Sequence, residues 1–131
     1  MLDESKAYSG FAVPDLEAAK KFYGEALGLS VKTLMDDVLI QIGGDDRPVL
    51  VYQKDDHKPA NYTILNFPVA DVDAAVDELA GRGVDFERYD GFNQDEKGIA
   101  RPEEPGQGPT IAWFTDPAGN VLAVHEQLPT G

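Results

Sequence analysis

One phrase of this sequence occurs twice. Residues 11–19 read Phe-Ala-Val-Pro-Asp-Leu-Glu-Ala-Ala, and residues 67–75 read Phe-Pro-Val-Ala-Asp-Val-Asp-Ala-Ala. The Phe, the Val, the Asp and both Ala recur in register at an interval of 56 residues (67 − 11). A repeat at such an interval indicates two copies of one supersecondary unit. Only two copies fit in 131 residues, so we expect a pair of modules, about 7–55 and 61–127, within a single domain spanning 1–131.

Composition excludes several classes of function. Hydrophobic residues make up 42% and charged residues 27%, which is typical of a soluble globular domain. Acidic residues outnumber basic ones 24 to 11, and a net charge of −13 disfavours binding to nucleic acid or to an anionic membrane. The absence of cysteine excludes disulfides, thiolate zinc sites and cysteine nucleophiles. No apolar run approaches a membrane span and no signal peptide is evident, so we expect a cytoplasmic protein.

Turn residues divide the chain into short apolar segments. Asp15 and Asp71 each precede an apolar stripe at helical spacing, so we expect them to cap helices that end near Gly28 and Gly81. Each helix follows one strand and precedes three shorter ones, which predicts the order β-α-β-β-β in each module and an α+β fold. The expected strands are 7–13, 30–35, 38–42, 48–53, 62–69, 84–89, 110–115 and 120–126.

Residues 90–109 do not fit this pattern. The segment holds many glycines and prolines among charged residues, with only Ile99 to suggest a strand. A loop of this length in a compact domain is often functional or mobile. We expect a short strand near 98–101 within a flexible flap, and a plain surface loop is the simpler interpretation.

Four motifs occur in an order typical of one family. They are Val-Pro-Asp-Leu-Glu-Ala-Ala-Lys-Lys-Phe-Tyr (13–23), Leu-Gly-Leu (27–29), Val-Ala-Asp-Val-Asp-Ala-Ala (69–75) and Phe-Thr-Asp-Pro-Ala-Gly-Asn (114–120). In these motifs the chain resembles the vicinal oxygen chelate superfamily, which contains glyoxalase I, extradiol dioxygenases and the bleomycin- and fosfomycin-resistance proteins. The resemblance implies a glyoxalase-like fold, in which two β-α-β-β-β modules form an eight-strand mixed sheet curled around a cavity. It also implies a homodimer.

Enzymes of this family hold a divalent metal ion with His, Glu or Gln side chains. The resemblance implies that the equivalent positions here are Tyr8, Val49, Ile64 and Ala123. Valine, isoleucine and alanine have no donor atoms, and a lone tyrosine binds metal weakly unless it is ionised. We therefore expect no metal at these positions and no cofactor, with a divalent metal at a non-standard site as the alternative.

Strand alternation predicts which side chains face the cavity. The expected inward set is small or apolar with a few polar groups, which is typical of a ligand pocket and also of a cavity filled by side chains. Trp113 and Phe114 point to opposite faces, and the sequence does not decide which of them faces the cavity. The candidate ligand-pocket residues are Tyr8, Gly10, Ala12, Val49, Ile64, Asn66, Trp113, Ala123 and His125.

His125 is the candidate catalytic residue. It follows Ala123 by one pleat, so it could donate a hydrogen bond, act as an acid or base, or bind a displaced metal. Partners for acid–base chemistry would be Tyr8 or a flap carboxylate, Glu103 or Glu104. A structural histidine at a strand end is the simpler interpretation, because the other ligands are missing.

Three functions remain open at this level. The first is a metal-independent binding protein of the glyoxalase and bleomycin-resistance type, whose partner is a small apolar or aromatic molecule. The second is an enzyme of the lyase, isomerase or dioxygenase type with a non-standard metal or an acid–base site. The third is a protein-interaction module with a vestigial pocket. The missing metal ligands and the apolar inward face favour the first.

Overall fold

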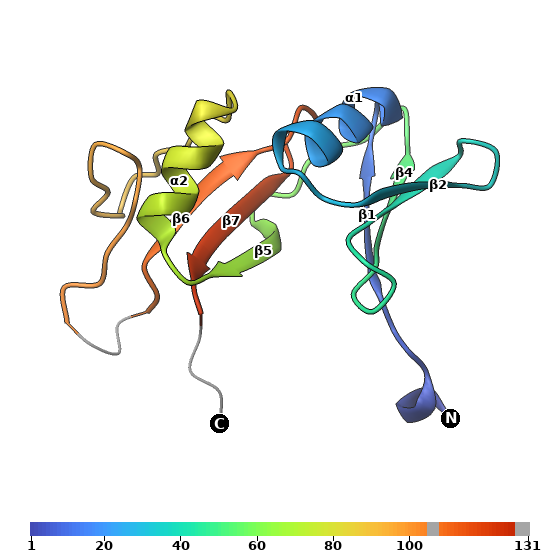
Figure 1. Cartoon of the computed structure of the whole chain (residues 1–131), viewed down its shortest axis with the longest axis horizontal. Helices are drawn as coiled ribbons and strands as arrows, with labels where there is room; N and C mark the ends of the chain where they lie inside the picture. The colour runs from blue at the N-terminus through green and yellow to red at the C-terminus, as the bar shows by residue number, and fades with distance from the viewer. Residues whose placement is uncertain (105–107, 128–131) are drawn as a thin grey trace. The chain divides into compact units, whose positions relative to one another are not determined.

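The computed structural model describes residues 1–104 and 108–127. The chain divides into two compact units, residues 1–58 and 59–131, which are called unit 1 and unit 2 below (Figure 1). In the described residues, seven strands form one sheet of four strands and one of three, accompanied by few helices, so the fold belongs to the α+β class. No helix within these described residues is long and apolar enough to cross a membrane.

Unit 1 has the predicted order β-α-β-β-β. Its sheet has the strand order β1-β4-β3-β2, in which β1 and β4 are parallel and the other pairs are antiparallel. Asp15 caps the helix as expected, since its Oδ1 accepts a hydrogen bond from the Ala18 amide at 3.1 Å. The elements are the 3₁₀ turn η1 (Leu2–Glu4), β1 (Ser9–Val13), α1 (Leu16–Lys21), the π-helical turn η2 (Phe22–Ala26), β2 (Val31–Leu34), β3 (Leu39–Ile42) and β4 (Val49–Gln53).

The first helix differs from expectation in its second half. Apolar residues continue at helical spacing to Leu27, yet α1 ends at Lys21 and the chain continues as the π turn η2. Gly28 then ends the helical segment with a φ of 73°, in the left-handed region where glycine carries no steric penalty. The apolar stripe is retained through this change, because Leu16, Ala19 and Tyr23 are all buried.

Unit 2 contains three strands and one helix among its described residues. The strand order is β5-β7-β6, with β5 and β7 parallel and β6 and β7 antiparallel. Asp71 caps α2 by accepting a hydrogen bond from the Ala74 amide at 3.0 Å, and α2 packs against β6 and β7 (Figure 1). The elements are β5 (Thr63–Val69), α2 (Val72–Gly81), β6 (Ile111–Thr115) and β7 (Val121–Glu126).

One of the eight predicted strands, residues 84–89, does not form. Residues 84–89 contribute one isolated bridge, in which Phe86 pairs with Phe114 beside β6. The ladder cannot extend because the next amide and carbonyl groups are bound by a side chain: Gln94 accepts from the Tyr89 amide and donates to the Glu87 carbonyl. The expected strand near 98–101 is likewise reduced to bridges from Ala100 to Gln94 and Ile111.

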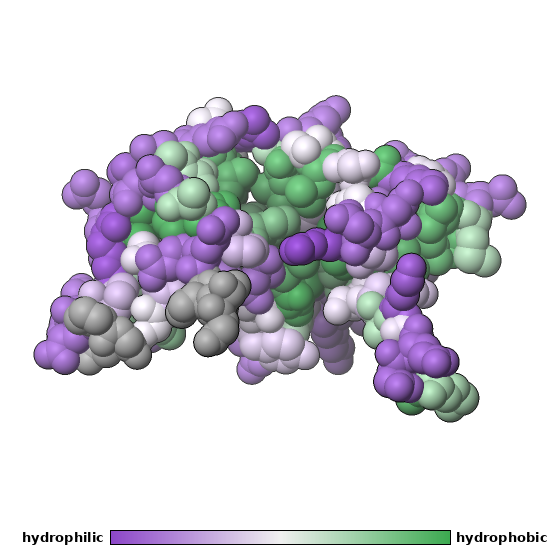
Figure 2. Space-filling model, turned by 60° about the horizontal axis from the view of Figure 1, so that its bottom comes forward, coloured by the Kyte–Doolittle hydropathy of each residue, from purple (hydrophilic) through white to green (hydrophobic). Residues whose placement is uncertain are grey.

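The surface is strongly polar. Figure 2 shows hydrophilic residues over much of the face that it presents, as the net charge of −13 leads one to expect. A few large apolar side chains are nevertheless exposed, and among the described residues of unit 2 these are Tyr62, 67% exposed, and Phe92, 54% exposed. Both belong to the hollow described next.

Candidate functional site

The pairing of β6 with β7 decides the orientation of the two neighbouring aromatic residues. Trp113 lies opposite Ala123, whereas Phe114 lies opposite Leu122. Successive residues of a strand face opposite sides of the sheet, so Trp113 shares its face with Ala123. Phe114 is fully buried on the other face, where its ring contacts Phe86. Trp113 therefore lies on the face that carries the hollows of unit 2, and Phe114 lies on the opposite face.

An aromatic hollow of about 510 Å³ lies over Trp113. The Trp113 ring is only 8% exposed and contacts the rings of Tyr89 and Phe92, with centroid separations of 5.4 Å and 4.8 Å and interplanar angles of 63° and 58°. Tilted contacts of this kind are favourable for aromatic pairs. The volume is within the usual range for small-molecule sites. The lining residues are Asn61, Tyr62, Thr63, Tyr89, Phe92, Trp113 and Val121.

A second hollow of about 400 Å³ shares Phe92 and Trp113 with the aromatic hollow. Its other walls come mainly from the segment after residue 90, and they include the charged side chains of Arg101 and Glu103. The two hollows therefore adjoin at Phe92 and Trp113, and the second hollow is the more polar. Residues 105–107, which belong to the predicted flap, lie outside the described residues.

Tyr89 supplies a polar group within the aromatic hollow. Burial raises the pKa of its phenol, and the nearby carboxylate of Glu87 raises it further. The hydroxyl therefore stays protonated at neutral pH and can donate a hydrogen bond to a ligand. Thr63 and Asn61 offer a further hydroxyl and an amide at the same hollow.

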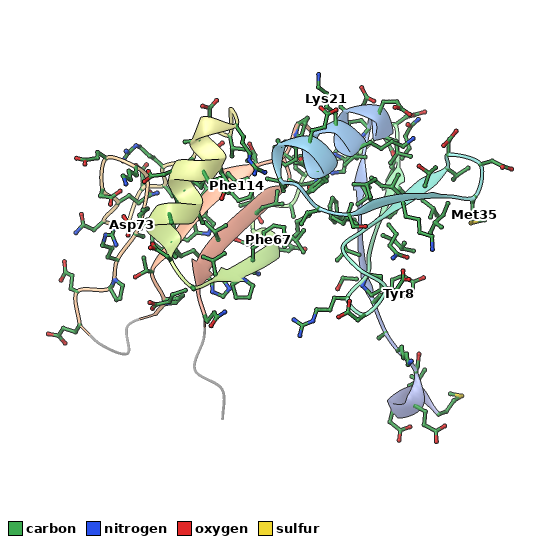
Figure 3. The ribbon with its side chains drawn as sticks, viewed as in Figure 1. Tyr8, Lys21, Met35, Phe67, Asp73 and Phe114 are labelled. Atoms are coloured by element: carbon green, nitrogen blue, oxygen red, sulfur yellow. The ribbon has the colours of Figure 1, made fainter. Side chains whose placement is uncertain are left out.

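An ionic cluster ties the loop that follows Phe92 to α2. Arg101 Nη2 donates to Asp73 Oδ1 at 2.7 Å and to Asp95 Oδ2 at 3.1 Å, and Nη1 donates to Asp73 Oδ2 at 3.2 Å. Asp73 lies on α2 (Figure 3). Lys97 Nζ lies 3.0 Å from Asp77 Oδ1. The bond from Arg101 lowers the pKa of Asp73. Such partly exposed pairs contribute little to stability, so the cluster chiefly orients the loop.

Asp95 is the member of the cluster that also folds the loop. Burial opposes ionisation of Asp95, but hydrogen bonds from the amides of Ile99 and Lys97 and from Arg101 outweigh it, so its pKa is lowered. A carboxyl group whose pKa falls on folding stabilises the protein above its unfolded pKa, about 3.9. That contribution is lost as the pH falls through the folded value.

Asp95→Asn is therefore expected to destabilise the protein at pH 7 and not at low pH. The loss at pH 7 should be about 1 kcal/mol or less, because the ion pair is partly exposed. Denaturant titrations from pH 7 to pH 3 should show the difference from wild type shrinking as the pH falls below about 4. Asp55→Asn, at an exposed turn carboxylate, is the control for loss of one negative charge and should be as stable as wild type at pH 7. A difference that stayed constant with pH would contradict the assignment.

The structure places the predicted pocket residues in both units. In unit 1, Tyr8 is exposed just before β1, Gly10 and Ala12 lie in β1, and Val49 opens β4 opposite Ser9. In unit 2, Asn66 and Ala123 are paired, Ile64 falls at an irregularity of β5, and His125 pairs with Pro68 and Ile111. Of this predicted set, Trp113 lines the two hollows described above.

Sequence reasoning missed most of the aromatic hollow. Tyr89 and Phe92 lie where a strand and a flap were expected, and Tyr62 precedes β5. The available signal was the recurrence of aromatic side chains beside the glycine-rich segment 90–109. That signal has no fixed spacing, because the loop geometry that brings these residues to Trp113 depends on side-chain hydrogen bonds.

Among the four positions that the resemblance implies for metal, the hydroxyl of Tyr8 is the one side-chain donor group. Ala123 is fully buried between Asn66 and Trp113 on neighbouring strands, and neither Val49 nor Ile64 carries a donor atom. Across residues 1–104 and 108–127 no group of three His, Cys, Asp or Glu side chains could hold a metal ion.

His125 lies near the end of β7, where a backbone carbonyl binds its ring. It is 8% exposed, and its Nδ1 lies 2.6 Å from the backbone carbonyl of Glu126. A carbonyl oxygen only accepts, so Nδ1 carries the hydrogen in this contact. This bond fixes the orientation of the ring. The candidate catalytic role of His125 remains a prediction.

Comparison with known proteins identifies the family. Residues 7–124 match the Glyoxalase/Bleomycin resistance protein/Dioxygenase superfamily. No curated protein sequence matches the chain significantly. Solved structures provide similar folds, among them TnmS3, an antibiotic binding protein from Streptomyces sp. CB03234, which is 24% identical with a TM-score of 0.66 and coverage of 95% of this chain and 98% of that one.

Two further structures show the same fold. A putative glyoxalase family protein from Bacillus anthracis is 18% identical, with a TM-score of 0.67 and coverage of 98% and 100% of the two chains. The fosfomycin resistance protein FosX from Mesorhizobium loti is 16% identical, with a TM-score of 0.60 and coverage of 95% and 93%. The chain belongs to the glyoxalase/bleomycin resistance protein/dioxygenase superfamily, the vicinal oxygen chelate proteins, as its motifs predicted.

Proposed function

We propose that this protein binds a small apolar or aromatic molecule without a metal ion, and that the aromatic hollow of unit 2 is the binding site. The observation that carries the proposal is the set of four aromatic side chains, Tyr62, Tyr89, Phe92 and Trp113, around one hollow of about 510 Å³. Membership of a superfamily that includes an antibiotic-binding relative supports the same conclusion.

The hollow suits a flat ligand for physical reasons. Aromatic rings offer large apolar contact areas and favour tilted or offset contacts with a further ring. Tyr62 and Phe92 are largely exposed, so a ligand that covered them would remove apolar surface from water. The Tyr89 hydroxyl, Thr63 and Asn61 provide the few polar groups that orient a ligand in a mostly apolar site.

Binding of a neutral aromatic probe tests the proposal. N-Phenyl-1-naphthylamine, whose emission rises in apolar surroundings, should bind saturably with one site per chain. Tyr62→Ala should weaken that binding about tenfold through loss of a ring contact and buried area. Tyr52→Ala, at a 45% exposed tyrosine of β4, is the matched control and should leave the affinity unchanged. Absence of saturable binding, or equal effects of the two variants, would contradict the proposed site.

Tyr8→Ala separates this site from the one predicted in unit 1. Tyr8 is 61% exposed and belongs to the predicted pocket set, whereas it is absent from the lining of both hollows. If the aromatic hollow is the site, Tyr8→Ala binds the probe as wild type does. A loss of affinity in Tyr8→Ala with none in Tyr62→Ala would move the site to the residues around β1.

Metal independence is tested by thermal unfolding of chelator-treated protein. A ligand present at a hundred times its dissociation constant adds about 2.7 kcal/mol of stability. Ni²⁺, Mn²⁺, Fe²⁺ and Zn²⁺ should each leave the unfolding midpoint unchanged, and probe affinity should be the same with and without chelator. A saturable rise that disappeared in His125→Ala would instead support an enzyme with a relocated metal.

The proposal extends to assembly and location. We propose a cytoplasmic homodimer, because members of the resembled family commonly pair. Light scattering should then give twice the chain mass of 14.2 kDa. A mass of one chain at micromolar concentration would exclude the dimer without affecting the aromatic hollow, which is lined by residues of unit 2.

A further inference from the structure

The amide side chain of Gln94 binds three backbone groups of the loop that carries Tyr89 and Phe92. Gln94 Oε1 accepts a hydrogen bond from the Tyr89 amide at 2.8 Å. Its Nε2 donates to the carbonyl of Glu87 at 2.9 Å and to the carbonyl of Gly98 at 2.8 Å. These three bonds join the two ends of the segment 87–98, and Phe92 lies between them.

At one end of this loop, Gly98 adopts a backbone conformation that favours glycine, and its carbonyl accepts a hydrogen bond from Gln94. Gly98 has a φ of 87°, and a Cβ there would lie 3.2 Å from the Cβ of Phe86. The chain thus turns sharply beside Phe86, and the Gly98 carbonyl is directed to Gln94. The loop is closed by this turn and by the Gln94 amide together.

We propose that Gln94 is a positioning residue, which holds Tyr89 and Phe92 against Trp113 before any ligand arrives. Its role in binding rests on the function proposed above, whereas its role in placing the two rings does not. Phe92 and Trp113 line both hollows, so the same side chain sets the shape of both. A preformed loop lowers the ordering cost of binding, and affinity is higher for that reason.

Glutamine is the side chain that this position needs. One acceptor must face the Tyr89 amide and two donors must face the two carbonyls, and only a carboxamide offers that combination. Glutamate would keep the acceptor and bring negative charge toward two carbonyl oxygens. Asparagine is one methylene shorter and would not span from the Tyr89 amide to the Gly98 carbonyl.

The single tryptophan of the chain reports on this arrangement without any ligand. Trp113 contacts both loop rings, so displacement of the loop exposes it to solvent. In Gln94→Ala, acrylamide should quench Trp113 emission more strongly than in wild type, and affinity for N-phenyl-1-naphthylamine should fall about tenfold. Gln41→Ala is the matched control, because Gln41 is a partly buried glutamine of β3 that bonds Asp45 in unit 1.

Gln94→Glu is the second variant and should behave like Gln94→Ala, with far-ultraviolet circular dichroism confirming that both are folded at the temperature used. Wild-type quenching in either folded variant overturns the proposal. Increased quenching with unchanged affinity also overturns it, since the loop would then not preform the site.

If wild type does not bind the probe, the proposed function fails, and quenching alone decides whether Gln94 places the rings. If neither variant folds, hydrogen exchange on wild type decides: a protected Tyr89 amide supports the proposal and rapid exchange overturns it.

Discussion

Trp113→Ala is expected to lose about 3–5 kcal/mol of the free energy of unfolding, which is the usual range for removal of a buried tryptophan. The Trp113 ring is buried against Ala100 and Ala123 and is flanked by Tyr89 and Phe92. Its removal leaves a cavity on one face of the β6–β7 pair. Denaturant titration followed by circular dichroism measures the loss, because the tryptophan fluorescence signal disappears with the only tryptophan.

Trp113→Phe provides the control for this prediction. A smaller ring keeps an aromatic surface at the centre of the hollow, so the expected loss is only about 1–2 kcal/mol. The folded Trp113→Phe variant should still bind N-phenyl-1-naphthylamine, a few-fold more weakly than wild type, as read from the emission of the probe. A Trp113→Ala protein as stable as wild type would show that the indole does not pack as described here.

Much of the fold follows from local signals that the sequence carries. Asp15 and Asp71 stand before apolar stripes, and both accept the capping hydrogen bond. In β7, Leu122 and Val124 alternate with Ala123, so they face the opposite side of the sheet. Such features depend on residues a few positions apart, so spacing alone is sufficient to predict them.

The departures arise where one side chain replaces a backbone partner. The strand expected at 84–89 is limited to the Phe86 bridge because Gln94, several residues later, binds the Tyr89 amide. No periodicity marks a glutamine that will act in this way. The same interaction brings Tyr89 and Phe92 to Trp113, so the missed strand and the missed aromatic residues have one cause.

The π turn η2 is a second departure, and it has a different origin. Apolar spacing is similar in an α-helix and in a helix with one widened turn, so the stripe that ends at Leu27 cannot distinguish them. Its burial is nevertheless correctly predicted, since Tyr23 is fully buried. Burial patterns were thus more predictable here than the hydrogen-bonding pattern of the backbone.

Ile99→Ala is expected to cost about 2–5 kcal/mol, the range for truncating a fully buried aliphatic side chain. Ile99 is 0% exposed although it lies in the segment expected to form a flap. Its amide donates to Asp95 Oδ1 and its carbonyl accepts from the Asp95 amide, while Ala100 beside it bridges to Ile111 of β6. The burial of Ile99 therefore indicates that the described part of this segment packs on the rest of unit 2.

The loss of unfolding free energy in Ile99→Ala distinguishes a loop that packs on the rest of unit 2 from one that does not. Ile99→Val, which removes one methylene, should cost only about 0.5–1.5 kcal/mol and is the graded control for denaturant titration. Probe affinity should fall in Ile99→Ala as well, because Phe92, which lines the aromatic hollow, belongs to the same loop as Ile99. A loss below about 0.5 kcal/mol, the range of an ordinary surface substitution, would mean that the segment does not pack on unit 2. The aromatic hollow would then lack the wall that Phe92 provides.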